Sequence, residues 1–93
     1  MQHGLFDSGD TWVNHYPNLA PAFQLANAGY DVFLGNNRGN QYSNRHKTLD
    51  PIKDDKKFHD YSFVEYGKYD LPAQINSALA ISGNQKLTYV GHS

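Results

Sequence analysis

The sequence contains no cysteine, which excludes a disulfide framework and a thiolate metal site. No segment approaches the ~20 apolar residues of a transmembrane helix, and the first residues lack the basic and apolar regions of a signal peptide. Eight scattered Lys and Arg residues stand against nine Asp and Glu, for a net charge of −1. Without a basic stripe, nucleic-acid binding is not expected. Localisation stays open.

The 93 residues, 39% of them apolar, are enough for one small core. No repeat or low-complexity tract divides them, so we expect a single unit. Short segments at residues 1–6, 30–34 and 86–90 are typical of strands. The short apolar core of segment 30–34 is followed by a glycine, which indicates a strand buried on both faces, as in a parallel sheet.

A helix is predicted between the first two strands. Apolar residues recur at steps of three and four over residues 19–26, which marks one helix face. Asn18 is the expected N-cap, and Pro21 falls in the first turn, where its missing N–H costs little. Gly29 is expected to end the helix.

The second helical region follows a long polar loop, residues 35–61, of a length that is often functional. Ser62 and Glu65 match a capping box and predict a short helix. Asp70 is the expected N-cap of a further helix that ends at Gly83. Alternation of strands and helices predicts a layered α/β fold with parallel strands and right-handed crossovers.

Two strand ends carry chemically suggestive residues, and catalytic groups of such sheets gather at these ends. After the last strand, Gly91 and Ser93 form Gly-x-Ser, the first half of a nucleophile elbow. On its own this motif fits an ordinary turn equally well. After the first strand, His3-Gly4 begins a turn in which the backbone N–H of Leu5 is the candidate oxyanion donor. The two motifs together, in this order, carry more weight than either alone.

Six segments, spread in order over the whole chain, resemble the acid lipase family of gastric lipase, lysosomal acid lipase and related sterol-ester hydrolases. They are Gln2-His3-Gly4-Leu5, Asp10-Thr11-Trp12-Val13, Leu25-Ala26-Asn27-Ala28-Gly29-Tyr30-Asp31-Val32, Leu34-Gly35-Asn36-Asn37-Arg38-Gly39-Asn40, Lys68-Tyr69-Asp70-Leu71-Pro72-Ala73 and Tyr89-Val90-Gly91-His92-Ser93.

The resemblance implies a partial α/β-hydrolase fold. Three parallel strands are expected, with the first between the other two and crossover helices on both faces. It implies that Ser93 is the nucleophile and Leu5 one oxyanion-hole residue. The family's second oxyanion donor, its Asp and His and its cap all follow the serine. Residues 1–93 are therefore expected to be one partial domain, truncated at Ser93. Family members of this kind are secreted, lysosomal or lipid-associated.

Two functions are open at this point. In the first, the complete protein hydrolyses esters of apolar lipids, such as triacylglycerols or sterol esters, and needs no metal or organic cofactor. In the second, the 93 residues are a catalytically inert fragment or an interaction module. A thin parallel layer leaves edges and faces uncovered, so weak stability and self-association are expected.

The histidines are not expected to serve as the base of Ser93. Adjacent side chains at a strand end point to opposite sides, which argues against His92. We expect His3 to shape the turn that follows it rather than to transfer protons. His15, His46 and His59 lie in polar segments and are expected at the solvated surface.

Other residues near the motifs allow two interpretations. The planar fork of Arg38 favours a structural role, tying the long loop to carboxylates or carbonyls, over substrate binding. Trp12 and Phe6 either belong to the core, which is the more common case, or line an acyl pocket. Asp7 and Asp10 suit helix entry or solvent better than acid–base chemistry.

Overall fold

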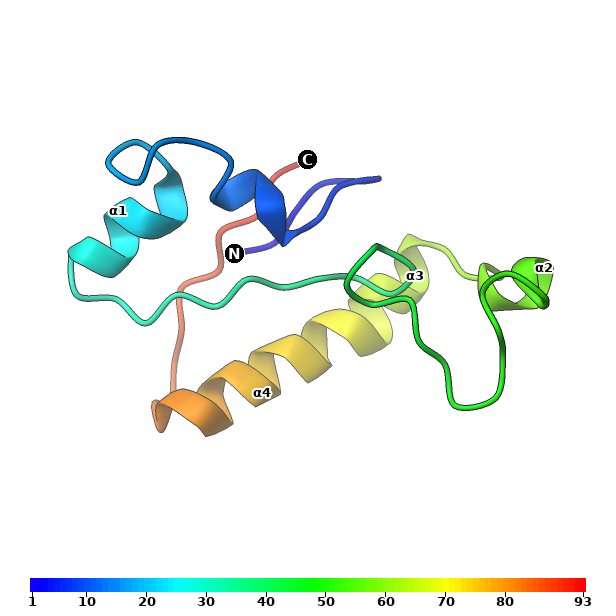
Figure 1. The fold of residues 1–93 in the computed structure, drawn as a ribbon. Coiled ribbons are helices and arrows are strands. Elements are labelled where there is room, and N and C mark those ends of the chain that lie inside the picture. Colours follow the sequence, from blue (N-terminus) through cyan, green and yellow to red (C-terminus); the bar gives the residue numbers. More distant parts are fainter.

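The computed structural model describes all 93 residues, Met1–Ser93, and Figure 1 shows its helices and extended segments. In chain order the elements are a 3-10 helix η1 (Gly9–Trp12), α1 (Pro21–Asn27), α2 (Asp55–Phe58), α3 (Phe63–Glu65), a π-helical turn η2 (Tyr66–Asp70) and α4 (Leu71–Ser82). No helix combines the length and apolarity that crossing a bilayer requires.

Helix α1 begins and ends largely as its sequence predicts. Pro21 is the first helical residue, so the N-cap is Ala20. The predicted N-cap, Asn18, lies two residues earlier in the chain, and that prediction is wrong. At the other end Gly29 adopts a φ of +98°. The Gly29 N–H donates to Ala26 and the Tyr30 N–H to Leu25, the two bonds of a Schellman motif.

Helices α3 and α4 form one continuous helical stretch through η2. The capping box predicted at Ser62 and Glu65 is confirmed, with both reciprocal hydrogen bonds formed. Asp70 holds the N-cap position of α4, as predicted, but its side chain makes no capping bond. Its backbone is already helical, because η2 leads directly into α4. Gly83 ends α4 with a φ of +74°, as expected.

The three predicted strands are not confirmed. Pairing is limited to two parallel bridges, which join Gln2 to Gly35 on one side and to Gly91 on the other. Residues 30–33 and 86–89, which precede these paired positions, form no bridge. The first segment also turns away after His3, so no ladder of several residues forms.

Pairing nevertheless brings three distant parts of the chain together. The Gln2 N–H donates to Val90 O at 2.7 Å, and the Gly35 N–H donates to Met1 O at 2.9 Å. The amino group of Met1 donates to Phe33 O at 2.7 Å, and its partial burial lowers its pKa below the ordinary value. Segment 1–2 therefore lies between the other two segments.

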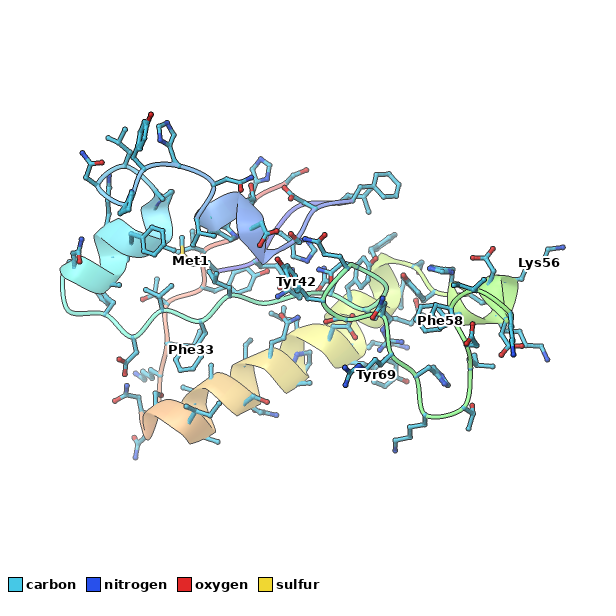
Figure 2. The ribbon with its side chains drawn as sticks, in the orientation of Figure 1. Met1, Phe33, Tyr42, Lys56, Phe58 and Tyr69 are labelled. Carbon is cyan, nitrogen blue, oxygen red and sulfur yellow. The ribbon has the colours of Figure 1, made fainter.

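The interior is only partly filled. Nine of the 93 residues are buried, and the apolar ones are mostly alanines: Ala20, Ala22, Phe58 and Ala78. A cleft of about 1050 Å³ separates α4 from the extended segments, and Phe33 lies at its wall (Figure 2). In Figure 1, α1 and α4 lie on opposite sides of the extended segment 30–36. The helices are therefore arranged in layers around the extended segments, but no closely packed apolar core lies between them.

We expect Gly39→Ala to destabilise the protein more than Gly29→Ala. Both glycines have a positive φ, +86° at Gly39 and +98° at Gly29, so both substitutions introduce about 1–2 kcal/mol of backbone strain. A Cβ at Gly39 would in addition coincide with the Tyr61 hydroxyl, whereas the space at Gly29 is open. Urea unfolding of the two variants measures the difference, and equal losses would contradict the contact between residues 39 and 61.

Candidate active site

The pairing of Gln2 places the start of the chain beside its last residues. The His92 N–H donates to Gln2 O at 3.1 Å, which holds segment 91–93 alongside residues 2–4. A Cβ built on Gly4 would lie 3.2 Å from the Cβ of Ser93 and 3.3 Å from the carbonyl oxygen of His92. A side chain at position 4 would therefore require His92 and Ser93 to move by a few tenths of an ångström. The two motifs found in the sequence meet at one place.

Residues 4–7 form a tight turn at this place, called here the 4–7 turn. The Asp7 N–H donates to Gly4 O at 3.2 Å, and Phe6, the third residue, has a φ of +62°. A positive φ at this position is typical of a type II turn and is normally reserved for glycine. The backbone N–H of Leu5 donates to no atom of the chain. It is free to bind a ligand oxygen.

Ser93 itself has a left-handed backbone, with a φ of +50°. A strained serine after a strand-like segment is the backbone feature of a nucleophile elbow. Its side chain is exposed and makes no hydrogen bond within the chain. No histidine of the chain reaches its hydroxyl. The site therefore contains a candidate nucleophile and a candidate oxyanion donor but no general base.

His3 is buried and connects the 4–7 turn to the loop after residue 34. Its Nδ1 lies 2.7 Å from Gly4 O, and its Nε2 accepts from the Asn37 N–H at 3.1 Å. The Asn40 side-chain amide lies 3.2 Å from the same Nε2. The expectation that His3 shapes the turn agrees with these contacts, since both ring nitrogens are occupied.

Asparagines that the sequence interpretation did not single out hold this loop. The Asn36 side-chain oxygen accepts from the Gly9 N–H at 2.8 Å and from the Asn40 amide at 3.0 Å. The Ser43 hydroxyl donates to Asn36 O at 3.0 Å, which closes the loop on itself. The only sequence signal was the clustering of Asn residues directly after a predicted strand.

Arg38 joins this loop to the helical stretch. Its backbone N–H and its Nε donate to the two carboxylate oxygens of Asp70 at 3.0 and 2.8 Å, and its Nη2 lies 2.7 Å from Oδ1. The guanidinium lies between the rings of Tyr61 and Tyr69, 5.9 and 5.7 Å from their centroids. The hydrogen bond to Asp70 raises the pKa of Arg38. The structural role predicted for Arg38 is confirmed, and Asp70 is its carboxylate.

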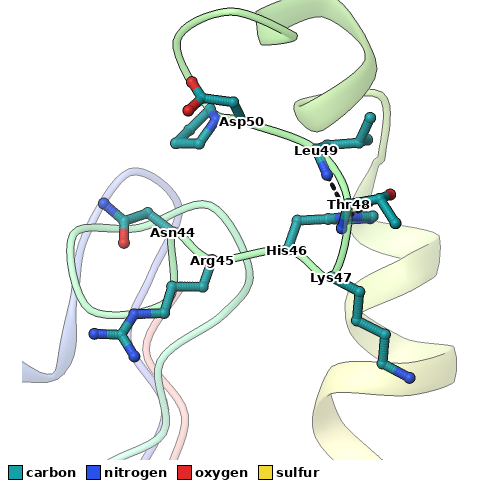
Figure 3. A pocket seen from close by; sticks show the side chains of 8 residues that line it. Asn44, Arg45, His46, Lys47, Thr48, Leu49 and Asp50 are labelled. Atoms are coloured by element: carbon teal, nitrogen blue, oxygen red, sulfur yellow. Dashed lines mark hydrogen bonds between the residues drawn. The ribbon is translucent and has the colours of Figure 1, made fainter.

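The remaining candidates lie away from Ser93 or at the surface. His15, His46 and His59 are exposed, as expected. The Nδ1 of His46 accepts from the backbone N–H of Leu49 at 3.0 Å. His46 is one of the residues that line a polar hollow of about 390 Å³ within loop 44–51. Figure 3 shows the lining side chains, and in Figure 1 this loop lies away from the C-terminus.

The aromatic and acidic residues within and after the 4–7 turn differ in their exposure and contacts. Phe6 is 99% exposed, so it does not belong to the core, whereas Trp12 is half-buried. Asp7 accepts from the Ser8 N–H at 2.8 Å at the entry to η1, as expected. Asp10 accepts from the Tyr42 hydroxyl at 2.7 Å at the surface. No group of three His, Cys, Asp or Glu side chains lies close enough together to hold a metal ion.

A family model described as the alpha/beta hydrolase fold matches residues 1–93. The chain belongs to the α/β-hydrolase fold family. The resemblance of its segments to the acid lipases is confirmed by relatives that match over the whole chain.

Three relatives represent these matches. The chain is 53% identical to Lipase 1 of Drosophila melanogaster, 48% to gastric triacylglycerol lipase of Rattus norvegicus and 46% to lysosomal acid lipase/cholesteryl ester hydrolase of Homo sapiens. Each match covers 100% of this α/β-hydrolase chain but only 21% to 23% of the relative. The chain therefore spans less than a quarter of the length of these relatives.

We expect Asp70→Asn to lower the free energy of unfolding by about 1–2 kcal/mol, because it weakens the charge-assisted bonds from Arg38. The Arg38 side chain keeps 38% exposure, so the loss stays below that of a fully buried pair. Asp31→Asn is the matched control: this residue is exposed and unbonded, and its substitution should change stability by less than about 0.5 kcal/mol. Equal effects in urea unfolding would contradict the role of Asp70.

Proposed function

We propose that the 93 residues are the N-terminal part of the catalytic domain of a serine carboxylic-ester hydrolase. In this proposal Ser93 is the nucleophile and the backbone N–H of Leu5 is one oxyanion donor. The single observation that carries the proposal is the close approach of Gly4 to Ser93, with 3.2 Å between a Cβ built at position 4 and the serine Cβ. It brings the turn that holds a free N–H beside a strained serine.

In the reaction, the Ser93 hydroxyl oxygen attacks the carbonyl carbon of the ester while a histidine takes its proton. The carbonyl oxygen becomes an oxyanion, which accepts a hydrogen bond from the Leu5 N–H. The bond to the alcohol then breaks, and the histidine gives its proton to the leaving alcohol. Water attacks the acyl-enzyme in the same way and releases the acid. The histidine, its orienting aspartate and the second oxyanion donor follow Ser93 in the complete protein.

The proposal extends to the fold. In the complete protein, segments 1–3, 30–35 and 86–91 become three parallel strands with the first in the middle, and crossover helices cover both faces. The two bridges at Gln2 support this order because they are parallel and lie on its two sides. Further strands and the opposite layer would fill the cleft beside α4.

Apolar lipid esters, such as triacylglycerols or sterol esters, are the proposed substrates. The support is the identity of 46% or more to relatives named gastric triacylglycerol lipase and lysosomal acid lipase/cholesteryl ester hydrolase. The side chains of Leu5 and Phe6, 68% and 99% exposed, lie in the turn next to Ser93 and offer an apolar surface to an acyl chain.

The alternative is that the 93 residues alone are inert. No base reaches Ser93, and a serine hydroxyl is a weak nucleophile at neutral pH without one. Nine buried residues also provide little of the apolar burial that stabilises a domain. We therefore propose that the isolated chain neither hydrolyses esters nor stays monomeric at high concentration, and that activity belongs to the complete protein.

Ser93→Ala is expected to lower kcat/KM of the complete protein for a triacylglycerol emulsion by at least about 10⁴-fold, because no other group replaces the nucleophile. Ser77→Ala is the matched control: Ser77 is exposed on α4 and makes no hydrogen bond, so its loss should leave the rate unchanged. Rates are measured by fatty-acid release and with a short chromogenic ester.

Retention of hydrolysis in Ser93→Ala would overturn the assignment of the nucleophile. Hydrolysis of the short ester without any hydrolysis of triacylglycerol or cholesteryl ester would agree with the proposed esterase activity. It would contradict the proposed class of lipid substrates. Serine-dependent turnover by residues 1–93 alone would contradict the need for a base beyond Ser93.

A further inference from the structure

The protonation state of the His3 ring follows from its contacts. A backbone N–H only donates, so the Asn37 N–H at 3.1 Å requires an unprotonated Nε2 on His3. The proton of the neutral ring is then on Nδ1, which lies 2.7 Å from Gly4 O and donates to it. His3 is only 6% exposed, so water does not compete for these bonds.

The side chain of Asn40 leads to the same tautomer. Its oxygen Oδ1 accepts from the backbone N–H groups of Tyr42 and Ser43 at 2.9 and 3.0 Å. This fixes the orientation of the amide, so its Nδ2 group is the one that faces His3 Nε2 at 3.2 Å. Two donors from the asparagine loop therefore meet one ring nitrogen.

The bond from Nδ1 has a consequence at the next peptide group. Gly4 C=O and Leu5 N–H belong to the same peptide unit, which is planar and trans, so they point in opposite directions. Holding the Gly4 oxygen therefore also sets the direction of the Leu5 N–H. The Asp7 N–H binds the same oxygen at 3.2 Å, so two donors fix this carbonyl.

We infer that His3 is a positioning residue for the oxyanion donor. In its Nδ1-protonated form it fixes the peptide between Gly4 and Leu5, while Asn37 and Asn40 hold its ring in that form. This inference rests on the proposed function of the Leu5 N–H. A donor that is oriented before the reaction stabilises the oxyanion without reorganisation, and such orientation acts on kcat rather than on substrate binding. Because both ring nitrogens are engaged, His3 is not the base of Ser93.

Two amide substitutions of His3 each retain one of the two hydrogen-bonding contacts of the imidazole ring. In His3→Asn, the side-chain NH₂ lies near the place of Nδ1 and still donates to Gly4 O, but it does not reach Asn37. In His3→Gln, the side-chain oxygen lies near the place of Nε2 and accepts from Asn37, but no donor faces Gly4 O. Both variants lose part of the network, so both lose stability.

In the complete protein we expect His3→Gln to lower kcat for a chromogenic ester by about 10- to 100-fold with little change in KM. We expect His3→Asn to stay within about threefold of the wild type, even where its Tm is lower. His15→Gln, at an exposed histidine, is the control for the substitution and should match the wild type. Labelling of Ser93 by a fluorophosphonate counts the folded active sites in each sample.

If the wild type shows no Ser93-dependent hydrolysis, the proposed function fails, and this inference fails with it. If hydrolysis depends on Ser93 but His3→Asn loses as much kcat as His3→Gln, the inference alone is overturned. If neither variant folds, the inference is tested on the wild type by determining the tautomer of His3. Long-range ¹H–¹⁵N correlation spectra are expected to show the proton on Nδ1. A proton on Nε2 would overturn the inference.

Discussion

The structure depends on the backbone of Gln2, which pairs on both sides at once. Its N–H and C=O bond to Val90 and His92 on one side, and its neighbour Met1 accepts from Gly35 on the other. These few bonds join segments more than thirty residues apart in the sequence. Closing such long loops lowers the chain entropy, so further contacts are needed to offset the cost. Further contacts form two residues after Gln2, where Gly4 and the 4–7 turn lie against the last residues of the chain.

The contacts that follow are mainly polar rather than apolar. His3 and the asparagine loop occupy the place beside the 4–7 turn, and the Arg38–Asp70 pair ties that loop to the helical stretch. The two non-glycine residues with a left-handed backbone, Phe6 and Ser93, flank the same place. Backbone conformations of this kind are common at catalytic sites.

Local signals in the sequence were sufficient for the ends of α1 and α4 and for the start of α3, whereas η1 and α2 were not predicted. The capping box at Ser62 and the left-handed glycines that end α1 and α4 depend on residues only a few positions apart, so they could be predicted. The partner of Arg38 could not, because Asp70 is 32 residues away and its type equally suits a helix cap. The strands were predicted from composition, but a strand also needs a partner in register. Pairing here is limited to the bridges from Gln2 to Gly35 and to Gly91. The sequence pattern placed Leu5 and Ser93 at the ends of two predicted strands, whereas the order of the strands followed only from the family resemblance.

The most direct test is a crystal structure of the complete protein after reaction with an alkyl phosphonate ester, which imitates the tetrahedral intermediate. The account predicts phosphorus bonded to the Oγ of Ser93, with one phosphoryl oxygen about 2.7–3.1 Å from the backbone nitrogen of Leu5. An adduct whose oxygen points away from the 4–7 turn, or a phosphonate bonded to another residue, would contradict it.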